Sequence, residues 1–596
     1  MSDVKIEVKK PKVLIDEVEV EIDPGSTIIQ AAKKAGKHIA HFCYHEGLSI
    51  VGQCRMCFVE IEGQKKLATA CSTPVADGMK IKTASDAVKS GQNSTIEFIL
   101  LNHPLDCPIC DRGGECKLQD YTLEYGPPRS RMVDDKVLRD KHRPLSKDVV
   151  LDQERCILCT RCTRFSKEVD GRAELVVNER GNDSCIDIFE GKTFDSPFSG
   201  NVVDLCPVGA LTAEDFRFQA RPWELKNHSG ICTGCAVGCN VEIDTQHRHP
   251  GIPRPDKAAP RPVIKRLTPR KNRNVNDWWL CDKGRWGYHF HNEDAKRLYN
   301  PMLRKGSELE SKLENVSLRE FQMEIEASTG DWEFRVDGTF PHEGIAWAKD
   351  LAKSWKDRGR KVALNPSANS DRLIKIWSQF IAKSPWGVAP ADWNGITEVV
   401  STKTYRDLET IAPVLSLKLG QKVREGKLKW TQTPDVSTAK VADNVAILFD
   451  VPQSKAALDQ LEKISPSAKL LILWTQVNSR GLLNEGLAPT EILSEGSPSN
   501  NLFLFTQKTQ NELPAGLIAK LVEAKRLFVA DSFMQDSWSA LAHGVLPLTP
   551  LYESRATFTN LEGHQQVADG IRIYHPNTPS IHRGSDEMVS ASLKLL

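Results

Sequence analysis

The chain has 596 residues, of which 40% are apolar, enough to build the cores of several domains. Its 79 basic and 78 acidic residues nearly cancel, so the net charge gives no indication of a general polyanion-binding role. The longest apolar runs, such as Phe98–Leu101 and Leu470–Trp474, are far too short to span a bilayer. The first ten residues, MSDVKIEVKK, lack the apolar segment of a signal peptide. We therefore expect a soluble intracellular chain, or one held at a membrane only through partner proteins.

The first part of the chain predicts a small β-rich domain. Residues 4–8 and 17–22 alternate apolar and polar side chains, which is typical of strands. After a turn at Pro24-Gly25, Ser26 is predicted to cap a helix that continues to about Lys34, and residues 58–61 form another strand. This order of elements is that of a β-grasp ferredoxin.

Cysteines are the most informative residues, and all sixteen lie before residue 282. The first four follow the spacing C-x10-C-x2-C-x13-C and form a first set: Cys43, Cys54, Cys57 and Cys71. Four thiolates on neighbouring loops suit a [2Fe–2S] centre, although the spacing is longer than the plant-type pattern. The absence of a secretory signal argues against a disulfide framework, because a reducing compartment keeps thiols free.

A second set follows an amphipathic helix predicted over residues 87–101. It lies in the segment HPLDCPICDRGGECKLQD and consists of His103, Cys107, Cys110 and Cys116. Gly113 and Gly114 allow the tight turn that returns Cys116 to the other ligands. Three cysteines leave a cubane one ligand short, and an imidazole can complete it, since histidines ligate the Rieske centre. We predict a [4Fe–4S] cluster with one histidine ligand.

A third set combines a CxxCxxC run with a remote Cys-Pro: Cys156, Cys159, Cys162 and Cys206. The short run can surround one face of a cubane, and the remote thiolate completes the site. Zinc is the alternative, because CxxC pairs are also typical of zinc sites. Zinc sites usually combine two short pairs, so the triplet favours iron and sulfur. Cys185 fits no set, and we interpret it as a semi-buried free thiol.

A fourth set predicts another [4Fe–4S] cluster and has a long internal spacer: Cys232, Cys235, Cys239 and Cys281. The spacer includes residues 245–276, which contain nine Lys or Arg, six prolines and Asp256 as their one acid. Such a composition predicts an extended or disordered segment rather than a folded insert. It is either a solvated loop or an arm that lies across an acidic surface of a neighbouring subunit.

Beyond about residue 300 the pattern changes to alternating helices and short apolar strands. Helices are predicted at 346–356 and 371–383, and strands at 361–364, 445–449 and 470–474. This alternation is typical of parallel βαβ layers. Neither GxGxxG after a strand nor GxxxxGK[ST] occurs, so a nucleotide site is not supported.

Together these motifs resemble the large iron–sulfur (G-type) subunit of bacterial-type NADH:quinone oxidoreductase, respiratory complex I. The resemblance rests on residues 43–60 and 103–120 and on the segments ERCILCTRC and GNVVDLCPVGAL. Residues 528–566, with FVADSFMQDSWSALAHGVLP, YESRATFTN and LEGHQQ, are similar to the closing motifs of molybdopterin oxidoreductases but depart from them in places. No cysteine follows Cys281 to ligate molybdenum, so the resemblance implies a cofactor-free scaffold.

The resemblance also implies a multidomain α+β fold in four parts. These are a β-grasp [2Fe–2S] domain (1–85), a domain with two [4Fe–4S] clusters (86–225), a [4Fe–4S] domain of molybdopterin-oxidoreductase type (226–290) and a reduced molybdopterin-oxidoreductase-like α/β domain (291–596). NADH and FMN would bind to a partner chain, and single electrons would pass from the first set to the third and then the second. A ferredoxin-like subunit near the quinone site would receive them, and the fourth cluster would lie off this route.

Within complex I, the chain would be a peripheral subunit on the cytoplasmic face of the inner membrane, without contact to nucleic acid and without catalytic residues of its own. Proton pumping would belong to the whole complex. Two alternatives share parts of the cysteine pattern: the catalytic subunit of a molybdenum-dependent formate dehydrogenase and the electron-transfer arm of an NAD-linked hydrogenase. The short back half without cysteine argues against the first, and a chain that extends well beyond residue 240 argues against the second.

Overall fold

A computed structural model describes the chain between residues 10 and 571, and it divides into two compact units, residues 1–224 and 225–596. The described part omits residues 190, 248–261, 307–311, 366–369, 385, 387–390, 453, 477, 486, 488, 490–500, 507–512, 514, 549–550, 554 and 570. The two units are described separately. The predicted strand at 4–8 lies outside the described residues.

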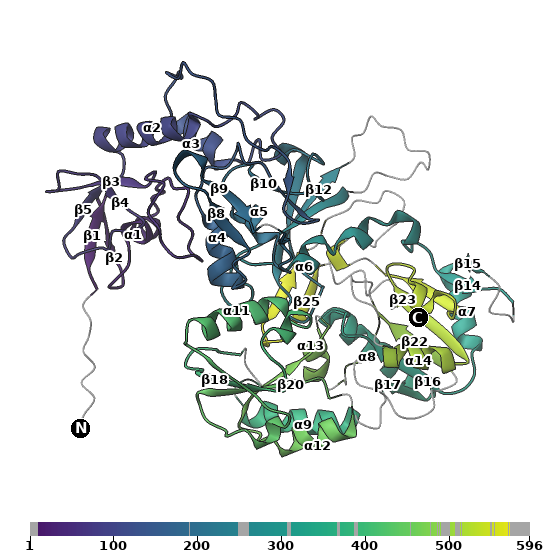
Figure 1. The fold of residues 1–596 in the computed structure, drawn as a ribbon. Helices are drawn as coiled ribbons and strands as arrows, with labels where there is room; N and C mark the ends of the chain where they lie inside the picture. The colour runs from purple at the N-terminus through teal and green to yellow at the C-terminus, as the bar shows by residue number, and fades with distance from the viewer. Residues whose placement is uncertain are drawn as a thin grey trace, which may run out of the picture. The chain divides into compact units, whose positions relative to one another are not determined.

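The N-terminal unit begins with a mixed sheet in the order β2-β1-β5-β3-β4 (Figure 1). Its elements are β1 (Lys12–Ile15), β2 (Val18–Glu21), α1 (Ile28–Lys34), β3 (Phe58–Ile61), β4 (Ala68–Thr69) and β5 (Lys80–Lys82). Apolar side chains such as Ile15, Ile28 and Val59 are buried between the sheet and α1. Helix α1 starts one residue later than predicted, because Thr27 and Gln30 form a capping box.

The remainder of this unit consists of short elements joined by long loops. They are α2 (Asp86–Leu100), α3 (Lys117–Tyr125), β6 (Arg143–Pro144), β7 (Val149–Leu151), α4 (Arg161–Arg164), β8 (Leu175–Asn178), β9 (Cys185–Ile188), α5 (Asn201–Leu205) and β10 (Leu211–Ala213). Helix α4 continues as a π-helical segment, Phe165–Asp170. With so little regular structure, the loops that carry the cysteines are positioned largely by side-chain contacts.

The C-terminal unit opens with an antiparallel sheet, β11 (Leu225–Ile231), β12 (Asn240–His247) and β13 (Pro262–Pro269). The prediction that residues 245–276 form no folded insert is therefore wrong where the chain is described. Ile264 and Leu267 on β13 are buried, and Arg266 forms an ion pair with Asp244 at 2.6 Å. Prolines and basic residues obscured this alternation in the sequence. The middle of the insert, 248–261, lies outside the described residues.

Two further sheets form the α/β part of this unit (Figure 1). One has the order β15-β14-β24-β23-β22-β16-β17, in which β24, β23, β22, β16 and β17 are parallel. The other, β19-β18-β20-β21, is entirely parallel. The strands are β14 (Met302–Arg304), β15 (Leu313–Asn315), β16 (Trp332–Val336), β17 (Val362–Leu364), β18 (Glu398–Ser401), β19 (Lys429–Gln432), β20 (Val445–Asp450), β21 (Lys469–Leu473), β22 (Asn501–Phe505), β23 (Arg526–Asp531) and β24 (Gly544–Pro547). The predicted parallel layering is confirmed.

Helices connect these strands, and a final hairpin follows them. The helices are α6 (Asp282–Trp286), α7 (Leu318–Ala327), α8 (His342–Asp357), α9 (Ser370–Lys383), α11 (Pro413–Arg424), α12 (Lys455–Lys463), α13 (Ser479–Asn484), α14 (Ala515–Glu523) and α15 (Asp536–Ser539), and the hairpin is β25 (Ala556–Thr559) with β26 (Gln565–Ala568). In the described residues, no helix is long and apolar enough to cross a bilayer.

Candidate metal centres

Three cysteines of the first set lie on the loop before β3, and the fourth, Cys71, lies just after β4. Cys43, Cys57 and Cys71 are buried, and Cys54 is half-buried. The thiols contact one another, since Cys43 bonds to Cys54 and Cys71, and Cys71 also bonds to Cys57. These hydrogen bonds, led by that from Cys54, lower the pKa of Cys43 to about 2. The same contacts raise the pKa of Cys54 and of Cys71, and together they show that the four sulfurs converge.

The second set surrounds a tight turn after α2. Cys110 and Cys116 are buried and Cys107 is exposed, and the buried Nδ1 of His103 has no hydrogen-bond partner in the described residues. Burial lowers the pKa of His103 to about 4, so its ring is neutral at physiological pH. A neutral imidazole whose buried nitrogen forms no hydrogen bond can bind a metal through that nitrogen. At Gly113 a Cβ would lie 2.8 Å from the Cys107 carbonyl oxygen, so the turn requires glycine.

The third set faces a common cavity. All four thiols line it, together with apolar side chains that include Leu151, Ile186 and Val208. Left-handed backbone at Leu158 (φ 50°) and Thr160 (φ 58°) folds the loop so that Cys156, Cys159 and Cys162 turn toward the same space. Burial raises the pKa of Cys159 to about 11, a cost that metal binding to the thiolate would offset.

The fourth set lies in the C-terminal unit, and its four thiols are buried. The main-chain N–H of Cys232 donates to the carbonyl oxygen of Cys239 at 2.8 Å, which closes the loop of the triplet. Cys281 is the N-cap of α6, and its sulfur accepts a hydrogen bond from the Gly284 N–H at 3.3 Å. A Cβ at Gly284 would lie 2.9 Å from the Cys232 sulfur and 3.5 Å from that of Cys281, so both sulfurs adjoin this glycine.

The closing motifs of the chain pack against this fourth loop. Asn560 Nδ2 donates to the Val237 carbonyl oxygen at 3.0 Å, and Gln566 Nε2 donates to that of Gly238 at 2.8 Å. The Leu561 N–H donates to the carbonyl oxygen of Ala236 at 2.6 Å. Residues more than 300 positions away in sequence thus hold the loop that carries Cys235 and Cys239.

The first and third sets meet at a junction formed by two arginines of α4. Arg164 Nη2 donates to the carbonyl oxygens of Cys43, at 2.5 Å, and Cys159, at 3.2 Å. Arg161 donates to the carbonyl oxygens of Tyr44, at 2.6 Å, and Leu205, at 3.2 Å. We call these contacts the first junction.

The second and third sets meet at a second junction. The Lys117 N–H donates to the Pro207 carbonyl oxygen at 3.2 Å, so the residues next to Cys116 and Cys206 are joined. Gly209 is so close to the second set that a Cβ there would lie 2.2 Å from the Cys110 sulfur. At this junction the backbone of the third-set loop thus lies directly against the Cys110 sulfur.

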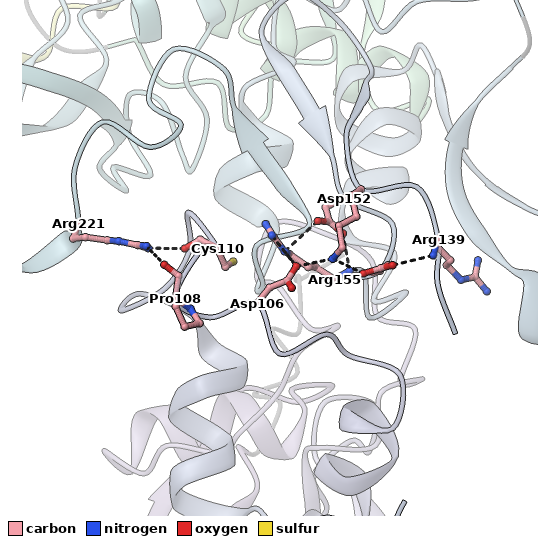
Figure 2. A network of polar contacts seen from close by, with 9 residues as sticks. Asp106, Pro108, Cys110, Arg139, Asp152, Arg155 and Arg221 are labelled. Atoms are coloured by element: carbon pink, nitrogen blue, oxygen red, sulfur yellow. Dashed lines mark hydrogen bonds and ion pairs between the residues drawn. The ribbon is translucent and has the colours of Figure 1, made fainter. Parts of the chain in front are cut away.

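Charged groups reinforce the second junction, as Figure 2 shows. The buried Arg155, next to Cys156, donates to Asp106 at 2.9 Å and forms an ion pair with Asp152 at 3.1 Å. Arg221 donates to the carbonyl oxygens of Pro108 and Cys110, the latter at 2.6 Å (Figure 2). Although burial opposes it, the Cys110 sulfur and Asp106 raise the pKa of Arg155.

Sequence reasoning identified the four sets but missed the arginines that join them. Arg155, Arg161 and Arg164 stand within or beside the run ERCILCTRCTR, where their position next to ligands was an available signal. Cys185, on β9, is half-buried and does not line the cavity of the third set. Its interpretation as a free thiol remains a prediction.

The donor chemistry fits iron–sulfur clusters. Thiolate is the ligand that such clusters prefer, and the third set spreads its sulfurs around a cavity rather than around one point. In the described ranges, no three His, Cys, Asp or Glu side chains are spaced to share a single ion. Fold and thiol sets together define a protein with several iron–sulfur centres.

Comparison with known proteins places this class within one family. The 2Fe-2S iron-sulfur cluster binding domain matches residues 9–86, the NADH-ubiquinone oxidoreductase-G iron-sulfur binding region matches 92–131, and the NADH-quinone oxidoreductase subunit 3 ferredoxin-like domain matches 146–212. The 75 kDa subunit of NADH-ubiquinone oxidoreductase from Reclinomonas americana is 34% identical over 526 residues, 84% of this chain and 70% of that protein. The G subunit of NADH-quinone oxidoreductase from Rickettsia felis is 31% identical over 591 residues, 94% and 84% of the two chains.

The chain belongs to the family that contains the G subunit of NADH-quinone oxidoreductase and the 75 kDa subunit. It is an iron–sulfur electron-transfer subunit of complex I, with 2Fe-2S and 4Fe-4S binding domains in its N-terminal unit. The formate dehydrogenase and hydrogenase alternatives are less supported. A solved NAD+-reducing [NiFe]-hydrogenase shares 28% identity, but its TM-score of 0.32, over 35% of this chain and 90% of that one, is too low to compare folds.

Proposed function

We propose that the chain carries one [2Fe–2S] and three [4Fe–4S] clusters on the four sets, and binds neither molybdenum nor FMN nor NAD. When bound, such clusters supply one-electron redox chemistry. The chain's own residues provide the thiolate and imidazole ligands and keep them in a buried, apolar setting. None of them needs to transfer a proton or act as a nucleophile.

The electron route that we propose passes from the first set over the third to the second. The observation that supports this order is that the third set has a junction with each of the other two. Arg164 bonds to ligands of the first and third sets, and Gly209 of the third-set loop touches Cys110 of the second. The third site is therefore proposed as the intermediate one.

The proposed partners follow from this order. The flavin subunit, which binds NADH, would donate electrons near the first set, and a ferredoxin-like subunit would accept them near the second. Cys107 is an exposed ligand, and its neighbours Leu105 and Ile109 are 89% and 63% exposed. Exposed apolar side chains beside a ligand suit a protein surface that becomes covered in a complex. The chain would then lie on the cytoplasmic face of the inner membrane through its partners.

The C-terminal unit is proposed as a reduced molybdopterin-oxidoreductase-like scaffold. Its closing segment donates three hydrogen bonds to the loop of the fourth set, from Asn560, Leu561 and Gln566. This packing gives the region a structural task that needs no cofactor. The fourth cluster, off the main route, would depend on it.

The elemental content of the anaerobically purified chain tests this proposal. We expect about fourteen irons per chain, from one two-iron and three four-iron clusters, without molybdenum. About ten irons would refute the count and would point to the fourth set, whose spacer is longest. Stoichiometric molybdenum would instead make the chain a catalytic subunit and overturn the carrier function.

A further inference from the structure

Arg164 places a buried positive charge between the first and third sets. Its side chain is 7% exposed, and its Nη2 bonds to the carbonyl oxygens of Cys43 and Cys159. Its Nη1 and Nε donate to the carbonyl oxygens of Ser49 and Thr160. All three guanidinium nitrogens therefore donate to backbone oxygens in the loops that carry the cysteine ligands.

Arg161 places a second charge at the same junction. It donates to the carbonyl oxygens of Tyr44 and Leu205, residues adjacent to Cys43 and Cys206. Its Nε is buried without a hydrogen-bond partner in the described residues. The Arg161 guanidinium therefore contacts the ligand loops of both sets.

Among the residues that the structure describes, neither arginine has a carboxylate as its counter-charge. Within the described part of the chain, their hydrogen bonds all end on main-chain oxygens, and no ion pair there includes them. Arg155 at the second junction differs, since Asp106 and Asp152 neutralise it. An unpaired buried cation is costly, and nearby anions are needed to compensate for it. Thiolate-ligated clusters in the first and third sets would supply that negative charge.

We infer that Arg161 and Arg164 are positioning residues that raise the reduction potentials of the first and third clusters and fix the separation of the two sites. This inference rests on the proposed function. One electron, donated by NADH through the partner flavin, adds one negative charge to a cluster without forming or breaking a bond. A buried cation stabilises the reduced form more than the oxidised form, because its attraction grows with the negative charge.

Substitutions that retain or remove the charge test the inference in the intact complex. Arg164→Lys keeps the cation but loses most of the hydrogen bonds, whereas Arg164→Gln keeps a polar group and loses the charge. We expect redox titration by electron paramagnetic resonance to show lower midpoints for the first and third clusters in Arg164→Gln than in Arg164→Lys. The second and fourth clusters should keep their wild-type midpoints.

The same pair of substitutions at Arg161 provides an independent test, and Lys167→Gln, an exposed cation three residues after Arg164, is the matched control. If the Arg164 variants both lose iron, the Arg161 pair decides. Loss of iron from the Gln variants alone would support the inference, since the cation is then needed to hold the clusters. Equal midpoints in Lys and Gln variants with full iron content would overturn it, as would an equal shift in all four clusters. A wild-type chain with missing irons would refute the proposed function instead.

Discussion

Both junctions join the third set to another set, but the charged groups at the two junctions are arranged differently. At the first junction, Arg161 and Arg164 bind backbone oxygens and have no carboxylate partner in the described residues. At the second, Arg155 and Lys141 are surrounded by three acids, Asp106, Asp152 and Glu154. The first junction thus retains positive charge, whereas the three acids at the second balance Arg155, Lys141 and Arg221. Ion pairing can therefore join two sites without changing their reduction potentials, whereas unpaired arginines both join the sites and raise those potentials.

Removing the site that both junctions share should have the largest effect. Cys206→Ala opens the coordination of the third cluster, and an incomplete site usually loses its cluster and the order of the loops around it. We expect iron to fall from about fourteen to about ten per chain. NADH should then still reduce the first cluster in the complex but not the second, as freeze-quench electron paramagnetic resonance can show. Cys185→Ala, which removes a thiol outside the four sets, is the control and should keep all the iron.

Breaking the ion pairs of the second junction should mainly cost stability. Arg155→Met leaves the buried Asp152 without its cation, and removing one partner of a buried pair costs about 3–5 kcal/mol. Hydrogen exchange of residues 103–116 in the full chain would measure this as faster local opening. Arg131→Met removes a solvent-screened pair with Glu97 and should cost far less stability than Arg155→Met. Equal protection in the two variants would contradict the structural role of Arg155.

Gly209→Ala tests how closely the second junction is packed. The new methyl would lie 2.2 Å from the Cys110 sulfur, and such overpacking typically costs about 1–3 kcal/mol. We expect an altered resonance of the second cluster, although Gly209 lies on the third-set loop. Gly181→Asn is a suitable control. No atom lies within 4 Å of a Cβ placed at Gly181, and asparagine tolerates the φ of +60° there. An unchanged second-cluster signal in Gly209→Ala would show that the two loops are further apart.

His103→Cys should have the smallest structural effect. It tests how an added negative charge at the second site changes the midpoint of that cluster. It replaces a neutral imidazole with a thiolate, which adds one negative charge to the second site. We expect the cubane to persist with full iron content but a lower midpoint, and slower NADH:quinone turnover. His103→Ala, which supplies no ligand, is the comparison and should lose the cluster. Unchanged midpoint and turnover in His103→Cys would argue that His103 is not a ligand.

The sequence predicted regular elements well where local patterns decide them. Strand 58–61 is β3, and residues 445–449 lie in β20, because short apolar runs between turn residues leave few alternatives. It failed for β13, since Ile264 and Leu267 become buried only through pairing with β12. That prediction relied on composition, whereas pairing with β12 determines the structure of this segment.

The candidate sites show the same division. Spacing alone grouped fifteen cysteines and His103, because cluster ligands recur at short intervals in the sequence. The roles of Arg161 and Arg164 could not be found in this way. Their partners Cys43, Tyr44 and Ser49 lie more than a hundred residues away, and only the folded chain brings them together. The orphaned Nδ1 of His103 is likewise visible only once burial is known.

The order of the three sites in the N-terminal unit is the central claim, and pulsed electron paramagnetic resonance tests it most directly. In the intact complex reduced with NADH, dipolar couplings report the distances between paramagnetic clusters. We predict that the third cluster is closer to the first and to the second than those two are to each other. A separation between the first and second clusters that is the shortest of the three would contradict the account.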